Sequence, residues 1–262
     1  MPKEQTVLFH ETVFGPIHSR RLGVSLGINL LPNDGKICSF DCVYCEAGYN
    51  AQGQGKDGVA RRDTLKRQLR AKLKQMRENG EPLNTITFSG NGEPTIHPQF
   101  KDIVHDVVTL RNEYYPEAKI SVLSNSTMAG RPQVAAALKM VDNNILKLDS
   151  AIDSTFLAIN QPVNHNVLPA GVIADLKQFS GQCVIQTMLL RGSHGTHKID
   201  NTTDAEIEAL IEAYLEINPR EVMIYGIDRT TPEENLEKVS KEELEAIGKR
   251  IAAAGLKVQV NA

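Results

Sequence analysis

Three cysteines stand close together near the start of the chain: Cys38, Cys42 and Cys45, in a C-x3-C-x2-C arrangement. The fourth cysteine, Cys183, comes far later in the sequence. A structural zinc site is normally closed by four protein ligands, and a cubane iron–sulfur cluster in an electron carrier normally takes four cysteines. Three thiolates on a cubane leave one iron open, where a substrate or cofactor can bind. The spacing therefore indicates a metal centre with an open coordination position.

Other uses of these cysteines remain open at this point. A histidine such as His10 or His18 would complete a zinc knuckle, and the chain would then be a nucleic-acid-binding module. An iron–sulfur electron carrier that binds no further cofactor is a second alternative. A disulfide framework is the weakest, because three cysteines so close together cannot all pair and no secretory context is visible. Metal analysis separates iron with acid-labile sulfide from zinc alone.

A glycine-rich run follows a predicted strand one unit after the cysteines, where residues 89–95 read Ser-Gly-Asn-Gly-Glu-Pro-Thr. Gly90 and Gly92 allow the backbone to approach a ligand closely and leave N–H and C=O groups free around Asn91. The carboxylate of Glu93 would pair with an ammonium group. Taken alone, the run could equally be a tight turn with a solvated glutamate. Its place after the cysteine loop favours a binding site.

Polar residues also end the next two predicted strands. Ser124 and Asn125 offer a hydroxyl and an amide that would bond a ribose hydroxyl or a carboxylate, or would cap the following helix. Lys147 and Asp149 lie on one face of their strand by alternation. Charged residues that point into a barrel need a partner or a ligand, so these two either neutralise each other or form a ligand-facing wall.

The fifth predicted strand carries Gln186 and leads to Arg191, and we expect both to line the same pocket. The loop that follows contains His194 and His197, which indicate substrate binding or a second metal, or else a solvated loop. Cys183 begins this strand beside two β-branched residues. We therefore expect it to be a buried core thiol rather than a metal ligand.

The elements that must position these residues alternate along the chain. Runs of β-branched residues predict strands at 25–30, 85–89, 120–124, 145–149, 184–190, 221–225 and 257–260. Helical periodicity predicts helices at 62–79, 99–114, 131–141, 167–179, 204–217 and 241–254. Such alternation indicates βαβ units and a parallel sheet, with ligands at the carboxyl ends of the strands. About six units are too few for a closed eight-fold barrel. We predict an α/β fold with an open, partial (β/α)6 barrel, in one domain over residues 1–262 with an N-terminal extension at 1–24.

The cysteine spacing, with Tyr44 just before the last cysteine, resembles the signature of the radical S-adenosylmethionine (SAM) enzymes. The Gly-x-Gly-Glu-Pro pattern at 90–94 resembles the element of that superfamily that binds the amino group of SAM. A Ser-Arg-Arg-Leu-Gly run at 19–23 and an Asn-Gln-Pro segment at 160–162 are similar to the group related to 4-demethylwyosine synthase. The wyosine enzymes carry extra N-terminal cysteines, whereas the first 37 residues of this chain contain none. The resemblance is therefore to a short, single-cluster member of the group.

The resemblance implies a partial barrel that holds a [4Fe–4S] cluster on Cys38, Cys42 and Cys45. The open iron would chelate SAM, and one electron would cleave SAM to methionine and a 5′-deoxyadenosyl radical. The expected SAM-binding residues are Tyr44 (through its backbone, against adenine), Gly90, Asn91, Gly92, Glu93, Ser124, Asn125 and Gln186. The residues expected at the substrate are Lys147, Asp149 and Arg191. An electron donor such as flavodoxin or ferredoxin is also implied.

Composition bounds the partners and the location. The chain is 41% hydrophobic, has no apolar run near the ~20 residues of a membrane span and has no apolar signal region at its start. We expect a cytoplasmic protein with reduced thiols and no membrane contact. The net charge of −3 exerts no general attraction on nucleic acid. A small-molecule substrate, for instance a nucleobase-like metabolite, is therefore favoured over a tRNA base.

One stretch runs against this charge balance. Residues 61–78 hold eight basic and two acidic residues, with Leu65, Leu69, Leu73 and Met76 at helical spacing. The pattern predicts an amphipathic helix. Its basic side is either a solvated face, which we favour, or a face that binds RNA or another anion.

Overall fold

The computed structural model describes residues 7–19, 22–229 and 231–261 of the chain. Two arginines of the Ser-Arg-Arg-Leu-Gly run, Arg20 and Arg21, lie outside the described residues. The described strands form one sheet with the spatial order β1-β2-β3-β4-β5-β6-β8-β10, and β7 and β9 both pair with β6. Their bounds are β1 Val13–Ser19, β2 Gly23–Ile28, β3 Thr85–Phe88, β4 Lys119–Ser124, β5 Asn143–Lys147, β6 Val184–His194, β7 His197–Asp200, β8 Glu221–Gly226, β9 Leu236–Lys238 and β10 Val258–Asn261.

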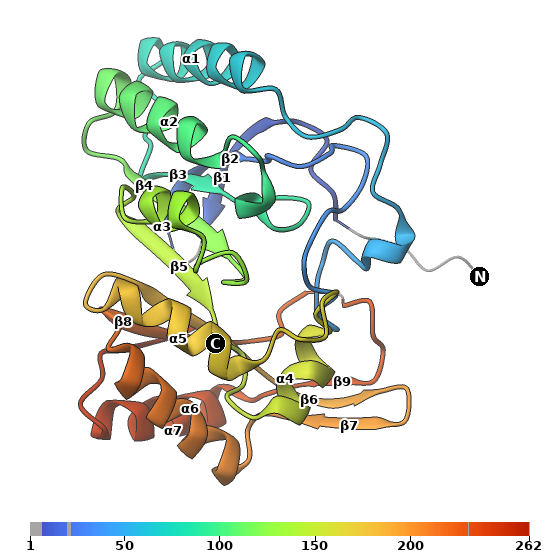
Figure 1. Ribbon diagram of the computed structural model, residues 1–262. Coiled ribbons are helices and arrows are strands. Elements are labelled where there is room, and N and C mark those ends of the chain that lie inside the picture. Colours follow the sequence, from blue (N-terminus) through green and yellow to red (C-terminus); the bar gives the residue numbers. More distant parts are fainter. Residues whose placement is uncertain (1–6, 20–21, 230, 262) are drawn as a thin grey trace.

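From β2 to β10 along this order, every neighbouring pair of strands is parallel, and at least one helix lies on each connection. The α-helices are α1 Arg62–Glu78, α2 Phe100–Tyr114, α3 Pro132–Leu138, α4 Asp153–Asn160, α5 Pro169–Leu176, α6 Asp204–Ile217 and α7 Lys241–Ala253. Short 3-10 turns occur at Asn50–Gln52, Pro94–Ile96 and Lys177–Phe179. The predicted α/β partial barrel is thus confirmed. In Figure 1 the blue segment after β2 and the orange β6–β7 hairpin lie on the same side of the molecule, away from α1, α2, α6 and α7.

The amphipathic helix predicted at 62–79 is α1, and its four apolar residues are fully buried. Part of its basic side faces α2 rather than solvent. Arg62 and Lys66 both bond the carboxylate of Asp106, at 2.7 and 2.9 Å, and Arg70 pairs with Glu113 at 3.1 Å. The neighbouring helix therefore pairs with three of the eight basic residues that the sequence concentrates here.

Among the described strands and α-helices, four were absent from the sequence prediction: β1, β7, β9 and α4. Strand β1 occupies part of the predicted N-terminal extension and pairs antiparallel with β2, with an irregular register between Phe14 and Ile17. Its Gly15-Pro16 pair hides it in the sequence, because both residues are depleted in strands and proline tolerates only an edge or a bulge. Helix α4 has eight residues, too few for a clear period.

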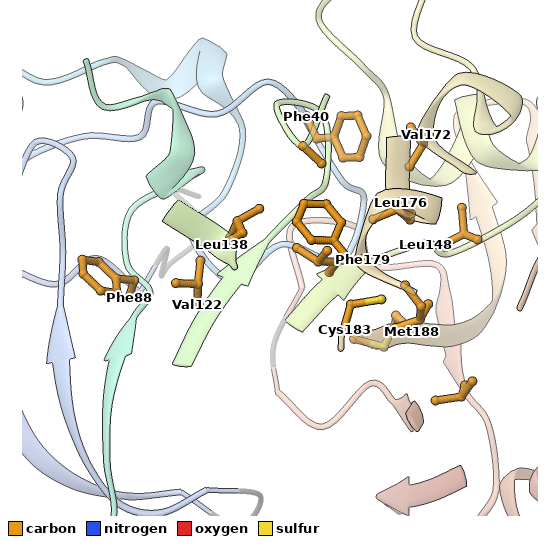
Figure 2. Close-up of a cluster of buried hydrophobic side chains, with 14 of the residues drawn as sticks. Phe40, Phe88, Val122, Leu138, Leu148, Val172, Leu176, Phe179, Cys183 and Met188 are labelled. Atoms are coloured by element: carbon orange, nitrogen blue, oxygen red, sulfur yellow. The ribbon is translucent and has the colours of Figure 1, made fainter. Parts of the chain in front are cut away.

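The main core lies between the sheet and the helices. Figure 2 shows Phe40, from the cysteine loop, among these buried apolar side chains, with Cys183 and Met188 in the same cluster. The ring of Phe40 meets that of Phe156 of α4 edge-to-face, with 5.6 Å between centroids. Cys183 is fully buried, as expected of a core thiol. Among the described residues, no helix combines the length and apolar character needed to cross a membrane.

Candidate active site at the carboxyl ends of the strands

The cysteine loop follows β2 and is held by backbone hydrogen bonds on two sides. On one side Ile37 N–H donates to the carbonyl of Asn91 (3.0 Å), and Glu93 N–H donates to the carbonyl of Ile37 (3.0 Å). On the other side Val43 N–H donates to the carbonyl of Ile159 at the end of α4 (3.0 Å). Phe40 anchors the loop in the core between these contacts. The fold therefore presents the three thiols from a supported loop at the carboxyl end of the sheet.

The glycines of the run after β3 are needed by the cysteine loop. Gly92 has a φ of +131°, and a Cβ there would lie 1.9 Å from the carbonyl oxygen of Ile37. A Cβ at Gly90 would lie 2.4 Å from Oδ1 of Asn29. The sequence predicted that this backbone approaches a ligand closely. In the structure, the close approach is to Ile37 and Asn29 of the chain. The side chain of Asn91 bonds Phe9 and the carbonyl of Pro32, so it faces the N-terminal segment.

Two of the three thiols, those of Cys38 and Cys42, lie where burial raises their pKa. Burial raises the pKa of Cys42 to about 11, and the charge of Asp149 adds to this. Burial also raises the pKa of Cys38, with the Glu93 carboxylate adding to it. A bound metal supplies the positive charge that turns such thiols into thiolates, and protons are released as it binds. These residues therefore suit a metal centre better than a free nucleophilic cysteine.

A buried cation lies in the same loop. Lys36 is 2% exposed and donates to the carbonyl of Gly48 at 2.5 Å and to Asp41 at 3.3 Å. Burial lowers the pKa of Lys36, but the charges that the three cysteines carry as thiolates, together with Asp41, outweigh it, so the pKa is raised overall. A lysine that stays charged offsets part of the negative charge that three thiolates bring to the loop.

The donor set fits an iron–sulfur cubane. Three thiols share one loop, with a buried cation and two side-chain amides directed at their sulfurs. Among the described residues, no group of three or more His, Cys, Asp or Glu side chains is arranged to hold a single metal ion. A cubane makes a different demand, because each cysteine binds a separate iron and the three sulfurs surround a larger object than one zinc ion.

Glu93 joins the ends of β3 and β4. It is 2% exposed; its Oε1 accepts from Thr95 N (3.0 Å) and from Ser124 Oγ (2.9 Å), and its Oε2 accepts from Asn125 N (2.6 Å). Burial raises its pKa although these hydrogen bonds oppose the shift. A carboxylate oxygen has two acceptor positions, so Oε2 retains room for a further donor. The structure thus brings three predicted SAM-binding residues together beside the cysteine loop.

The carboxamide of Asn125 reaches the cysteine loop itself. Its Nδ2 donates to Ser39 Oγ at 2.8 Å and lies 3.5 Å from the sulfur of Cys38. Its Oδ1 accepts from the backbone and hydroxyl of Thr127, at 3.1 and 2.8 Å. The side chain is therefore oriented from both ends.

Lys147 and Asp149 form a buried network with the tyrosine before the last cysteine. Asp149 is completely buried and accepts from Tyr44 OH, from Asn160 Nδ2 (2.7 Å) and from Met188 N (2.9 Å). Lys147 Nζ lies 3.6 Å from Asp149 Oδ1. The two charges thus neutralise each other, as one of the two sequence interpretations required.

Lys147 also lies between two aromatic rings. Its ammonium is 5.0 Å from the ring centroid of Tyr44 and 5.4 Å from that of Tyr225, and it donates to the Tyr225 hydroxyl at 2.9 Å. Burial lowers the pKa of Lys147, but Asp149 outweighs it and the pKa is raised overall. Lys147 therefore remains a cation that is 15% exposed.

The two predicted residues of β6 have different surroundings. Gln186 pairs in register with Lys147 and is 7% exposed, with Nε2 3.6 Å from the sulfur of Met223. Arg191 pairs instead with Glu243 of α7 (Nη1 to Oε2, 3.2 Å) and also bonds Thr202. The structure does not bring Arg191 together with Lys147 and Asp149. An odd number of positions separates Arg191 from Gln186, and alternation directs their side chains to opposite faces.

Sequence reasoning assigned no site role to Asn160, Tyr225 or Lys36. Asn160 was visible only as part of a shared Asn-Gln-Pro segment and Tyr225 only as the last residue of a predicted strand, and Lys36 carried no signal. The β6–β7 hairpin also reaches the cysteine loop, because His194 lies 2.9 Å from a carboxylate oxygen of Glu233 and Tyr49 OH donates to that oxygen at 2.5 Å. His197 is exposed.

Comparison with known proteins agrees with this arrangement. The model of the Radical SAM superfamily matches residues 33–162, which include the three cysteines, Glu93 and Asp149. A UPF0026 protein from Synechocystis is 30% identical over 227 residues, 84% of this chain and 77% of the relative. One from Methanocaldococcus jannaschii is 32% identical over 211 residues, 79% of this chain and 60% of the relative. A protein named GTPase Obg from Brachyspira hyodysenteriae is 26% identical over 254 residues, and the chain spans 35% of its length.

Solved structures share the fold at low sequence identity. A radical SAM methyltransferase from Sphaerobacter thermophilus superposes with a TM-score of 0.65 at 16% identity, covering 90% of this chain and 65% of that one. Streptococcus suis SuiB bound to S-adenosylmethionine gives 0.64 at 14% identity, covering 90% and 50%. TYW1 with a lysine-pyruvate adduct bound gives 0.59 at 13% identity, covering 87% and 73%. With the UPF0026 relative from Synechocystis and the family match, the conclusion is that the chain belongs to the UPF0026 family and that its residues 33–162 form a Radical SAM domain.

Proposed function

We propose that this protein cleaves SAM reductively at a [4Fe–4S] cluster held by Cys38, Cys42 and Cys45, and that the 5′-deoxyadenosyl radical acts on a small-molecule substrate. The observation that carries the proposal is the docking of the cysteine loop against the Gly90–Glu93 run at the carboxyl ends of the strands. When bound, the cluster supplies the electron and an open iron. The protein's own residues bind SAM and the substrate and exclude water.

The SAM side of the pocket is formed by the ends of β3 and β4. The second acceptor position of Glu93 Oε2 suits the ammonium of the methionine moiety. Ser124 and Thr95 orient that carboxylate from its other oxygen. The backbone of Tyr44 would lie against the adenine, while its side chain is held by Asp149.

The substrate side is formed by β5, β6 and β8. Lys147 offers a partly exposed cation between two tyrosine rings, and Gln186 lies beside it in the sheet register. A small anionic or polar molecule with a planar group fits such a wall. Asp149 is fully buried and would position Lys147 and Tyr44 rather than touch the substrate. We propose a cytoplasmic setting and a flavodoxin or ferredoxin as the electron donor.

Anaerobic SAM turnover tests the proposed function. We expect the reconstituted protein, given dithionite and SAM, to release 5′-deoxyadenosine and methionine, because the open iron and Glu93 together hold SAM beside the cluster. Chromatography of the products measures both. Protein with bound iron and sulfide that fails to bind or cleave SAM would be an electron carrier, and protein with zinc alone would be the zinc-binding alternative.

A tRNA-modifying activity is the second candidate, favoured by the basic side of α1 and by the sequence resemblance to the group related to 4-demethylwyosine synthase. On α1, the pairing of Arg62 and Lys66 with Asp106 reduces the charge available to a polyanion. This pairing favours the small-molecule substrate.

Binding of tRNA across a salt series separates the two candidates. A protein that neutralises Z phosphates of a duplex loses affinity with a log–log slope of about −0.9Z. We expect weak binding with a shallow slope, unchanged when Arg67, Lys72 and Lys74 are reversed to Glu. Arg62 and Lys66 are unsuitable for reversal because their partner Asp106 is buried. Tight binding with a steep slope that the reversals remove would favour the tRNA-modifying activity.

A further inference from the structure

Two side-chain amides reach cysteine sulfurs from opposite sides of the cysteine loop. Asn160 Nδ2, at the end of α4, lies 3.4 Å from the sulfur of Cys42. Asn125 Nδ2, after β4, lies 3.5 Å from the sulfur of Cys38. Both carboxamides are buried, at 0% and 7% exposure. Iron–sulfur clusters are held by cysteine thiolates, so these two amides would contact the sulfur ligands rather than the iron.

The orientation of Asn160 is set by its other contacts. A second N–H of the same amide group donates to Asp149 Oδ2 at 2.7 Å. Asp149 is in turn held by Met188 N at 2.9 Å and lies 3.6 Å from the ammonium of Lys147. The backbone carbonyl of Asn160 accepts from Asp41 N–H in the cysteine loop (3.1 Å). The nitrogen of the carboxamide, rather than its oxygen, therefore faces the sulfur, because the carboxylate needs a donor.

From this geometry we propose that Asn160 is a positioning residue that donates an N–H···S hydrogen bond to Cys42 and raises the reduction potential of the cluster on that cysteine. An N–H dipole stabilises negative charge on sulfur, and the reduced cluster carries one more negative charge than the oxidised one. Hydrogen bonds to the sulfurs are among the features that set the potential of such clusters. The inference rests on the proposed function, since it assumes a cluster at Cys42.

Asp149 connects this hydrogen bond to the substrate side of the pocket. The same carboxylate orients Asn160 on one side, and Tyr44 and Lys147 on the other. A ligand that draws Lys147 away from Asp149 would change the charge beside Asn160. Asn125 repeats the arrangement at Cys38 but also lies in the proposed SAM site, so Asn160 gives the cleaner test.

The experiment is a redox titration of the reconstituted cluster in the absence of SAM, monitored by electron paramagnetic resonance, with iron and sulfide counted in each variant. Asn160→Ala should retain the cluster and shift the midpoint to lower potential. We expect at least about a tenfold fall in the reduced-to-oxidised ratio at fixed potential, equivalent to about 59 mV for one electron. Asn160→Ser, which keeps a hydroxyl for Asp149 but lacks the reach to sulfur, should show the same shift if the alanine variant folds poorly.

Asn144→Ala is the matched control. Asn144 is a buried asparagine of β5 whose side-chain amide has no hydrogen-bond partner among the described residues, so its loss should leave the potential unchanged. An unchanged midpoint in both Asn160 variants, or an equal shift in Asn144→Ala, would overturn the inference while the proposed function stands. Wild-type protein that takes up no iron and sulfide would overturn both.

Discussion

Replacement of Cys42 by alanine is expected to abolish the iron–sulfur cluster and, with it, all cleavage of SAM. Wild-type protein purified without oxygen should hold about four irons per chain, as a cubane requires. Cys38→Ala and Cys45→Ala should behave like Cys42→Ala, because each removes one of three protein ligands and leaves a second iron open. Iron and sulfide analysis with the visible absorption spectrum measures the loss.

Cys183→Ala is the control for this series. Cys183 is fully buried just before β6 and belongs to the main cluster of buried apolar side chains. The variant should keep its full iron content and lose stability only by the cost of a small cavity. Loss of the cluster in Cys183→Ala with retention in Cys38→Ala would show that the ligand assignment is wrong.

Replacement of Asp149 by alanine should cause the largest loss of stability among single substitutions in the pocket. The change leaves Lys147 without its carboxylate in a buried setting and removes the acceptor of Tyr44, Asn160 and Met188 N–H. Breaking a buried ion pair by removing one partner costs about 3–5 kcal/mol. Denaturant unfolding of the cluster-free protein, compared with wild type treated alike, measures the free energy of unfolding.

An exposed ion pair with a shorter separation provides the control. Lys177 and Glu216 lie 2.8 Å apart with side chains 49% and 53% exposed. Glu216→Ala should cost about 0–1 kcal/mol, because water screens and solvates both charges. Lys147→Met should cost less than Asp149→Ala, since Asp149 would keep three hydrogen-bond donors. Equal stabilities of Asp149→Ala and Glu216→Ala would show that the buried network does not stabilise the fold.

Local pattern predicted most of the architecture. The apolar residues of α1 recur at helical spacing, and the strands are short β-branched runs separated by helices, so the βαβ units and the partial barrel could be predicted without coordinates. The cysteine triad and the Gly90–Glu93 run belong to consecutive units, and the carboxyl ends of neighbouring parallel strands meet at one edge. Their proximity was therefore predictable as well.

The partners of the site residues were not predictable in this way. Strand alternation predicts that Gln186 and Arg191 point to opposite faces of β6. The partner of Arg191, Glu243 of α7, depends on the length of β6 and on its pairing with β7 and β9. Asn160 belongs to a helix too short to show a period. Its contact with Cys42 depends on where α4 packs against the cysteine loop.

The sequence by itself determined most of the elements, the parallel arrangement of the main strands and the three thiols of the proposed metal centre, because periodicity and spacing are properties of adjacent residues. Only the tertiary structure decided that Glu93 bonds the end of β4, that Asp149 is buried beneath Tyr44, and that an asparagine of α4 faces a cysteine sulfur. Those contacts join segments far apart in the chain. They are set by the curvature of the sheet and the packing of helices against it, which no local pattern encodes.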